Sequence, residues 1–374
     1  MEESERTILV VSDLHLHPGS NPALVADFAR LLGTRPAGNL VINGDAFDLD
    51  RVAGERHAGE GGYRAACRLG NTLEKFPGFC EAISGWAARG GEIVWLPGNH
   101  DAELCLPVVR GVLLHRIGAA AGRVRFEPRC YQADGLHIEH GHQRDPDNSF
   151  FPDTAAAAAK QRLSALPVGC LTTRFLLCRI PAYDNHGDNH ATPGRVLLRV
   201  IKKHGRATPR MVMLYVLAAV RIAWQAILAR RRRDTETCSS MASPWRVLER
   251  MYLDRLAMAG VLSLIIMISL LGAAPPHTAL VAGLPCAAFL LWPPARRRLY
   301  RHRDRAGCRR AARSILQKSD GVVIMGHTHH AERLEWPHGV YVNPGAFFES
   351  QEAGRPFVVI DGHSAKVDFL PASD

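Results

Sequence analysis

Five short motifs along the chain combine aspartate, histidine and asparagine in patterns that suit metal binding. In chain order they read Asp13-x-His15, Gly44-Asp45-x-x-Asp48, Gly98-Asn99-His100-Asp101, His140-Gly141-His142 and Gly326-His327-Thr328-His329. Imidazole and carboxylate ligands together suit Mn, Fe or Zn, whereas a site made only of oxygen ligands would suit Mg or Ca. Any one motif carries little information, but the five together, in one chain, indicate a metal centre.

Each motif directly follows a short apolar run that is typical of a buried strand. These runs lie at residues 7–11, 39–42, 92–96, 136–139 and 321–325. Between the first three runs, residues 23–32 and 63–89 have apolar residues at helical spacing, which predicts helices there. Further strands are predicted at 124–127, 340–343, 357–360 and 366–369. Strands that alternate with helices predict an α/β fold, in which polar loops at the carboxyl ends of strands form the site.

The motifs supply more candidate ligands than one ion can use. These are Asp13, His15, Asp45, Asn99, His140, His327 and His329. We therefore expect two divalent ions bridged by Asp45, because a shared carboxylate offsets the repulsion between cations about 3.5–4 Å apart. In an extended segment residues i and i+2 point to one side, so His327 and His329 can face the same pocket.

The series of motifs resembles the calcineurin-like metallophosphoesterase superfamily, whose pattern is D-x-H, G-D-x-x-D, G-N-H-D/E, H and G-H-x-H. The resemblance covers residues 6–145 and 319–374. It implies a metallophosphoesterase-type β-sandwich flanked by helices, with two metal ions at the strand ends. It places Asp13, His15, Asp45 and His329 on the first ion, and Asp45, Asn99, His140 and His327 on the second. Mn is the expected metal, with Fe, Zn or Mg as alternatives.

The resemblance also implies a mechanism for hydrolysis of a phosphate ester. Two cations lower the pKa of a water that attacks phosphorus in line, and they neutralise charge on the phosphoryl oxygens. His100 is expected to contact the phosphoryl group or to protonate the leaving oxygen, with Asp101 orienting its ring. Asp48 is expected to support the ligands. His142 is expected near the substrate, although the H-x-H spacing leaves the choice of ligand between it and His140 open.

The turn Asn343-Pro344-Gly345 looks like the turn that closes the site in that family, or is an ordinary turn. Two repeats, Asp184-Asn185-His186 and Asp188-Asn189-His190, are interpreted as a polar loop, with a further cation site as the alternative.

Between residues 146 and 318 the strand pattern gives way to a segment rich in Ala, Leu, Arg and Met. We interpret it as a large helical insertion, or lid, in a catalytic domain formed by residues 1–145 and 319–374. Residues 256–295 are 40 consecutive residues without Asp, Glu, Lys or Arg. As a helix, residues 256–276 would reach about 32 Å, close to the ~30 Å thickness of the hydrocarbon layer, and residues 278–295 supply a shorter span.

Arginines flank this apolar stretch on both sides, at 246, 250 and 255 and at 296, 297, 298, 301 and 303. Positive charge at both ends is typical of a hairpin with both ends on the cytoplasmic side of a membrane. A buried helix pair in a soluble lid and a hairpin that enters one leaflet are the alternatives. Residues 211–229 are also apolar, but Arg221 at their centre would cost roughly 2.5–3.5 kcal/mol in a membrane, so we expect an interfacial helix. Arg230 to Arg233 then bind anionic lipid or are simply solvated.

The chain carries 46 Lys and Arg against 36 Asp and Glu, a formal charge of +10, and the excess lies mainly between residues 195 and 313. Such a region suits an anionic partner. Nine cysteines without a C-x-x-C pair fit a reducing compartment, and the acidic start, MEESER, is unlike a signal peptide. We therefore expect the chain on the cytoplasmic side of the inner cell membrane, with a cytoplasmic location as the alternative.

An apolar, arginine-flanked lid predicts a phosphorylated amphiphile with acyl chains as substrate. In this respect the chain is similar to the UDP-2,3-diacylglucosamine diphosphatases of lipid A synthesis, which also insert helices between the H-G and G-H-x-H motifs. That subgroup commonly has Arg in place of His100 and H-G-D in place of His140-Gly141-His142. One alternative is a soluble phosphodiesterase acting on nucleotides or nucleic acid, although no specific nucleic acid is expected. A scaffold without turnover is another, and the intact ligand set argues against it.

Overall fold

The computed structural model describes residues 7–51, 61–133, 135–145, 147–149, 163, 166–178, 199, 201–231, 253–271, 276–291, 303–349, 352–362 and 364–371. The chain divides into two compact units. The first, here called the sheet unit, comprises Met1–Arg174, Arg233–Met241 and Asp304–Asp374. The second, the helical unit, comprises Phe175–Arg232 and Ala242–Arg303. The sheet unit contains all five motifs and runs past residue 145, where the sequence places the start of the insertion.

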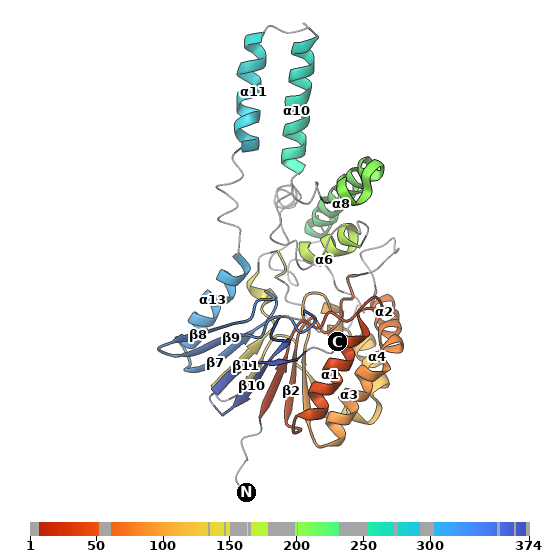
Figure 1. Ribbon diagram of the computed structural model, residues 1–374, viewed down its shortest axis with the longest axis vertical. Coiled ribbons are helices and arrows are strands. Elements are labelled where there is room, and N and C mark those ends of the chain that lie inside the picture. The colour runs from red at the N-terminus through yellow and green to blue at the C-terminus, as the bar shows by residue number, and fades with distance from the viewer. Residues whose placement is uncertain are drawn as a thin grey trace. The chain divides into compact units, whose positions relative to one another are not determined.

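Two mixed sheets form the centre of the sheet unit (Figure 1). The first has the order β11-β10-β1-β2-β3-β4, with bounds Ser364–Leu370, Arg355–Asp361, Ile8–Val11, Asn39–Asn43, Glu92–Leu96 and Val124–Phe126. The second has the order β5-β6-β7-β9-β8, with bounds Tyr131–Ala133, Leu136–Glu139, Gly321–Met325, Gly339–Asn343 and Glu332–Trp336. Strands β1 to β4 are mutually parallel, as are β6, β7 and β9, so the loops after β1, β2, β3, β6 and β7 open at strand carboxyl ends.

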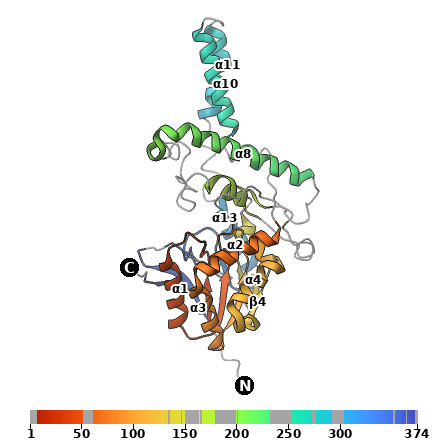
Figure 2. The ribbon, with the colours of Figure 1, turned by 90° about the vertical axis from the view of Figure 1, so that its right-hand side faces the viewer.

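Helices cover the outer face of each sheet. The first sheet is covered by α1 (Pro22–Thr34), α2 (Gly62–Lys75), α3 (Pro77–Ala88) and α4 (Pro107–Ile117), which lie together in Figure 2. Helix α13 (Arg303–Leu316) packs on the second sheet. In β3, Ile93 and Trp95 pack with the helices, whereas Val94 and Leu96 pack between the sheets. A strand buried on both faces has a continuous apolar sequence, which is why these strands could be predicted. The predicted α/β sandwich flanked by helices is confirmed.

The structure also contains elements that the sequence pattern did not predict. Strand β8 has the sequence ERLEW and is partly exposed, so it lacks the apolar run of a buried strand. Helix α13 is rich in arginine and buries only one narrow face. The helix expected at 63–89 is two helices, because Pro77 has no N–H to continue α2 and instead begins α3.

The described part of the helical unit includes α8 (Thr208–Arg231), α10 (Leu253–Leu270) and α11 (Pro276–Leu291). Helices α10 and α11 pack against each other and have lengths of about 27 Å and 24 Å at 1.5 Å per residue. They coincide with most of the two predicted spans. Residues 184–190, 232–250, 272–275 and 292–301 lie outside the described residues, and so do the predicted features within them.

Within the described part of the chain, one helix is long and apolar enough to cross a membrane, Ile201–Gln225. It includes much of the segment for which the sequence predicts an interfacial position. Gly260–Leu270 is a shorter apolar helix.

Candidate metal centre

Backbone hydrogen bonds hold the first two motifs side by side beyond the ends of β1 and β2. Asp13 N donates to Gly44 O at 3.2 Å, and His15 N donates to Asp45 O at 2.8 Å. The parallel pairing of the two strands thus continues into their loops. This continuation fixes the backbones that carry the two aspartates relative to each other.

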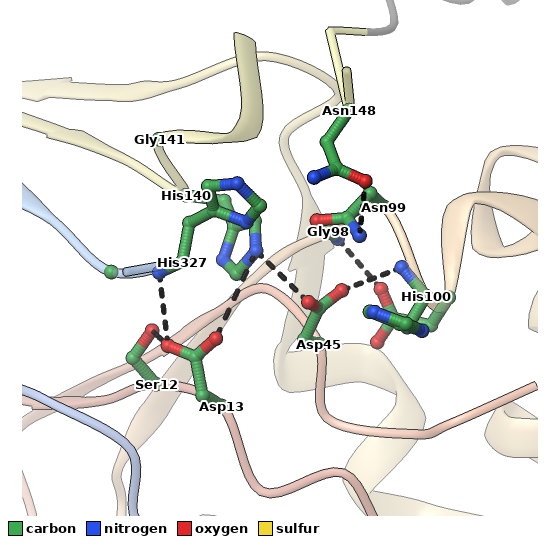
Figure 3. Close-up of polar contacts among 12 residues, drawn as sticks. Ser12, Asp13, Asp45, Gly98, Asn99, His100, His140, Gly141, Asn148 and His327 are labelled. Carbon is green, nitrogen blue, oxygen red and sulfur yellow. Dashed lines mark hydrogen bonds and ion pairs between the residues drawn. The ribbon is translucent and has the colours of Figure 1, made fainter. Parts of the chain in front are cut away.

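Side chains from opposite ends of the chain meet beside these loops (Figure 3). Asp13 Oδ1 lies 3.2 Å from His329 Nε2 and 3.7 Å from His15 Nε2. Asp45 Oδ2 lies 3.1 Å from His140 Nε2 and 3.7 Å from His15 Nε2. The backbone N–H of His327 donates to Asp13 Oδ2 at 3.2 Å. The structure therefore brings together the first, second, fourth and fifth motifs.

The potential ligand atoms form three groups whose members lie within 4.8 Å of one another. Two of them divide the residues as expected: Asp13, His15 and His329 in one, and Asp45, His140 and His327 in the other. The third group joins His15 and Asp45 to His100, which is not among the ligands predicted from the sequence. Figure 3 shows the Asn99 amide beside Asp45, and its buried Oδ1 accepts no hydrogen bond within the described part of the chain.

The backbone is strained at the candidate ligands. Among the residues that the structure describes, five other than glycine have a positive φ: Asp13 (54°), His15 (48°), Asp45 (49°), His327 (66°) and His329 (55°). Such conformations cost about 1–3 kcal/mol each and persist where the surrounding structure imposes them, often at functional sites. All five are candidate metal ligands, so the strain is confined to the residues that the chemistry requires.

His140 is oriented for metal binding by a carbonyl group. Its Nδ1 lies 2.8 Å from Asn43 O, and because a carbonyl oxygen can only accept, Nδ1 carries the proton. Nε2 is then the nitrogen that faces Asp45 and that could bind a metal ion. This arrangement is typical of histidines that bind metals. Burial alone would lower the pKa of His140, but Asp45 and Asp13 outweigh it and raise the pKa to about 9, so the carboxylates favour a cation at this point.

Two glycines allow the remaining loops to approach the carboxylates. A Cβ atom on Gly98 would lie 2.1 Å from Asp45 Oδ1, and one on Gly326 would lie 2.0 Å from Ser12 Oγ and 2.6 Å from Asp13 Oδ2. Any other residue would push the loop with Asn99, or the loop with His327, away from the aspartates. The glycines of these two motifs therefore have a steric role in assembling the centre.

His100 is held by carboxylates other than the one expected. Its Nδ1 lies 3.4 Å from Asp48 Oδ1 and 3.4 Å from Asp50 Oδ2, both buried. Burial would lower the pKa of His100, but Asp45, Asp48 and Asp50 raise it well above its usual value. Asp101, expected to orient the ring, instead accepts backbone N–H groups from Gly98 at 2.6 Å, Ala46 at 2.8 Å and Phe47 at 3.2 Å. It ties two loops together, and burial and Asp45 raise its pKa to about 7.

The other predicted residues lie around the centre. The ring of His142 is buried, with its centroid 5.3 Å from that of His140. Asn343 is also buried and donates to Gly326 O and Thr328 Oγ1, both at 3.0 Å. It therefore holds the segment between His327 and His329.

Several residues that contact the candidate ligands were not predicted from the sequence, among them Asp145 and Asn148. Asp145 Oδ2 lies 3.1 Å from His327 Nε2, and Asn148 Oδ1 lies 3.5 Å from Asn99 Nδ2. Burial would raise the pKa of Asp145, but His327 lowers it to about 2. The only signal in the sequence is that both follow closely after the His140 motif.

The donor set fits divalent ions. The buried carboxylates of Asp13 and Asp45 face four imidazoles and one amide oxygen, a mixture that suits Mn, Fe or Zn. Burial would raise the pKa of Asp13, but His140, His15 and His329 hold it far below its usual value, so this carboxylate is charged. Asp45 and His15 each lie in two of the three groups, and of these two residues only Asp45 has a pair of oxygens that could bind separate ions.

Comparison with known proteins gives one family. The model of the family described as calcineurin-like phosphoesterase matches residues 6–202. The match includes the first four motifs and the beginning of the predicted insertion, whereas His327 and His329 lie beyond it and are brought to the site by the fold. No curated protein matches the chain.

Proposed function

Because the chain belongs to the calcineurin-like phosphoesterase family and is a metal-dependent phosphoesterase, we propose that it hydrolyses a phosphodiester or diphosphate bond of a membrane-associated lipid or lipid-nucleotide. Asp13, His15, Asp45 and His329 would hold one ion. Asp45, Asn99, His140 and His327 would hold the other. Mn is the proposed metal. The observation that carries the chemistry is that five of these seven residues have left-handed backbones and that the ligand atoms of these five lie in neighbouring groups, each within 4.8 Å.

The chain's own residues supply binding and proton transfer. When bound, two divalent ions lower the pKa of water and stabilise negative charge on phosphoryl oxygens. His100 Nδ1 faces Asp48 and Asp50, and its ring lies beside His15 and Asp45. A histidine held in this way can keep a proton and transfer it to the leaving oxygen. Asp101 and Asn343 keep the loops of the centre in register through the hydrogen bonds described above.

Removal of metal provides the first test. We expect the purified chain to hydrolyse bis-p-nitrophenyl phosphate, to lose this activity after EDTA treatment, and to regain it with Mn²⁺. Fe²⁺, Zn²⁺ and Mg²⁺ are compared in parallel, and metal content is measured by mass spectrometry. Full turnover by protein that contains less than a tenth of an equivalent of metal would contradict the proposal.

A lipid substrate is supported by the apolar surface of the helical unit. Along α10 and α11, exposed side chains include Val261 at 45%, Leu264 at 50%, Leu270 at 83%, Val281 at 72% and Leu284 at 64%. Water-exposed apolar surface of this extent is unfavourable, whereas lipid acyl chains would cover it at little cost. We therefore propose that the α10–α11 pair contacts the cytoplasmic face of the inner cell membrane.

Helix α8 supports the same proposal with a different pattern. Met213, Leu217, Val220 and Trp224 recur every three or four residues and are 58%, 58%, 55% and 53% exposed, so they form one apolar stripe. Ala219 and Ile222, on another side of the helix, are buried, and the guanidinium of Arg221 lies 4.7 Å from the Phe175 ring centroid. A helix with an exposed apolar stripe and a cation that packs within the protein fits the membrane interface.

Fractionation tests membrane contact and substrate together. The membrane pellet and the supernatant are assayed with UDP-2,3-diacylglucosamine, other lipid diphosphates and cyclic nucleotides. We expect the protein in the pellet and activity on acylated compounds. Leu264→Glu should move protein into the supernatant, whereas Tyr63→Glu, at an exposed position on α2, should not. Activity that stays in the supernatant and acts only on nucleotides would favour the soluble phosphodiesterase instead.

A further inference from the structure

A short helix from the predicted insertion packs against the loop that carries Asn99 and His100. Helix α6 (Val168–Thr172) continues into a π-helical turn, Thr173–Leu177. The thiol of Cys170 donates to Asn99 O at 3.1 Å, and Gly169 N donates to Asp147 O at 3.1 Å, next to Asn148. These contacts, as far as Arg174, lie within the sheet unit. Helix α6, the first α-helix after the fourth motif among the residues that the structure describes, is therefore in direct contact with the catalytic loop.

Arg174, in the turn after α6, connects this helix to His100 through one carboxylate. Its Nε donates to Asp50 Oδ1, and its Nη2 donates to Glu103 Oε1. The Arg174 side chain is 6% exposed and that of Asp50 is fully buried. The second oxygen of Asp50 lies 3.4 Å from His100 Nδ1. A continuous chain of contacts thus runs from Arg174 to Asp50 and on to the His100 ring.

The charges explain why an arginine is needed at this position. Asp48 and Asp50 both face His100 Nδ1, and two buried carboxylates next to each other repel unless a cation compensates them. The planar guanidinium of Arg174 can hold Asp50 and Glu103 at once in fixed directions, which a flexible ammonium cannot do equally well. With Asp50 held in this way, its second oxygen stays at ion-pair distance, 3.4 Å, from His100 Nδ1, and this attraction favours one orientation of the ring.

We propose that Arg174 is a positioning residue that fixes the His100 ring through Asp50. Helix α6 of the predicted insertion thereby contributes to the geometry of the catalytic loop. The catalytic consequence rests on the proposed function, because it requires that His100 acts on the substrate. The positional consequence does not, and it can be measured without substrate.

The positional test uses the nitrogen chemical shifts of the His100 ring. The chain of residues 1–374, labelled with ¹⁵N-histidine, is measured without metal in detergent, and the His100 signals are assigned with His100→Gln. We expect Arg174→Met to shift them and Arg174→Lys to shift them less. Arg68→Met is the matched control, because Arg68 Nη2 contacts the same Glu103 oxygen as Arg174, at 3.4 Å. The carboxylates that face His100 Nδ1 are those of Asp48 and Asp50, so loss of the contact between Arg68 and Glu103 should leave the ring in place. The His100 signals of this control should match those of the wild-type chain.

The kinetic test is a double-mutant cycle with a substrate whose leaving group is an alkoxide. A small misplacement of a catalytic group can cost up to about a hundredfold in rate, so Arg174→Met should lower kcat by about ten- to a hundredfold with little change in KM. In the His100→Gln background the same substitution should have no further effect. A purely structural role would lower kcat equally in both backgrounds.

The outcomes separate this inference from the proposed function. If Arg174→Met does not fold, Arg174→Lys gives the same comparisons. His100 signals that are unchanged in a folded Arg174 variant would overturn the inference, and so would an equal loss of kcat in both backgrounds. If the wild-type chain hydrolyses no phosphate ester but Arg174→Met still shifts the His100 signals, the positioning role stands and the proposed function fails.

Discussion

Asp45→Asn is expected to lose both hydrolysis and metal. Asp45 is the carboxylate that faces His15, His100, His140 and His327 at once, and it is 1% exposed. Residues that only support metal ligands typically cost about 10–100-fold in affinity or activity when replaced, so loss of a bridging ligand should exceed about a thousandfold. The measurements are kcat with bis-p-nitrophenyl phosphate and the number of metal equivalents per chain.

Asp145→Asn is the matched comparison for this variant. Asp145 is also a buried aspartate beside a candidate ligand, His327, at 3.1 Å, but it belongs to none of the three ligand groups among the described residues. We expect its activity to fall by about 10–100-fold, with metal still bound. The bridging assignment would be wrong if Asp45→Asn retained two metal equivalents and the two variants had equal activity.

His100→Gln is expected to lower kcat by about 10²–10⁴-fold, the usual contribution of a general acid or base. The loss should be greatest with an alkoxide leaving group and smaller with p-nitrophenolate, which needs little protonation when it leaves. Two metal equivalents should remain, because the proposed ligand set does not include this ring. His100 nevertheless lies in one group with His15 and Asp45, so metal content is the decisive measurement.

His338→Gln is the control for loss of a histidine, because His338 is exposed and pairs with Asp320. We expect its kcat and metal content to match those of the wild-type chain. If His100→Gln loses one metal equivalent, His100 is a ligand. If it loses no activity with an alkoxide leaving group, its role in proton transfer is refuted.

Much of the sheet unit could be predicted because its strands carry local signals. Residues 39–43 and 92–96 are buried on both faces, so their apolar runs are continuous and end where the polar motifs begin. The resemblance added the pairing of distant motifs, Asp13 with His329 and Asp45 with His140. No local pattern carries that information, since Asp13 and His329, whose side chains meet, are 316 positions apart in the sequence.

The surroundings of His100 could not be predicted in the same way. Asp101 is its neighbour in sequence, but the carboxylate turns to the backbone N–H groups of Gly98 and Ala46. Asp50 has no motif of its own, and its partner Arg174 is one arginine among many in a basic segment. What distinguishes Arg174 is its burial between two carboxylates, which depends on how α6 packs.

The sequence by itself determined the chemistry of this protein: which side chains can bind metal, and that each follows a strand. Those features are local, because residue type and the spacing of apolar residues are written in a few consecutive positions. Only the tertiary structure decided which carboxylate faces which ring. A carboxylate can satisfy a backbone loop, an arginine or a histidine equally well, and the choice depends on which of them the packed sheets and helices bring within a few ångströms of it.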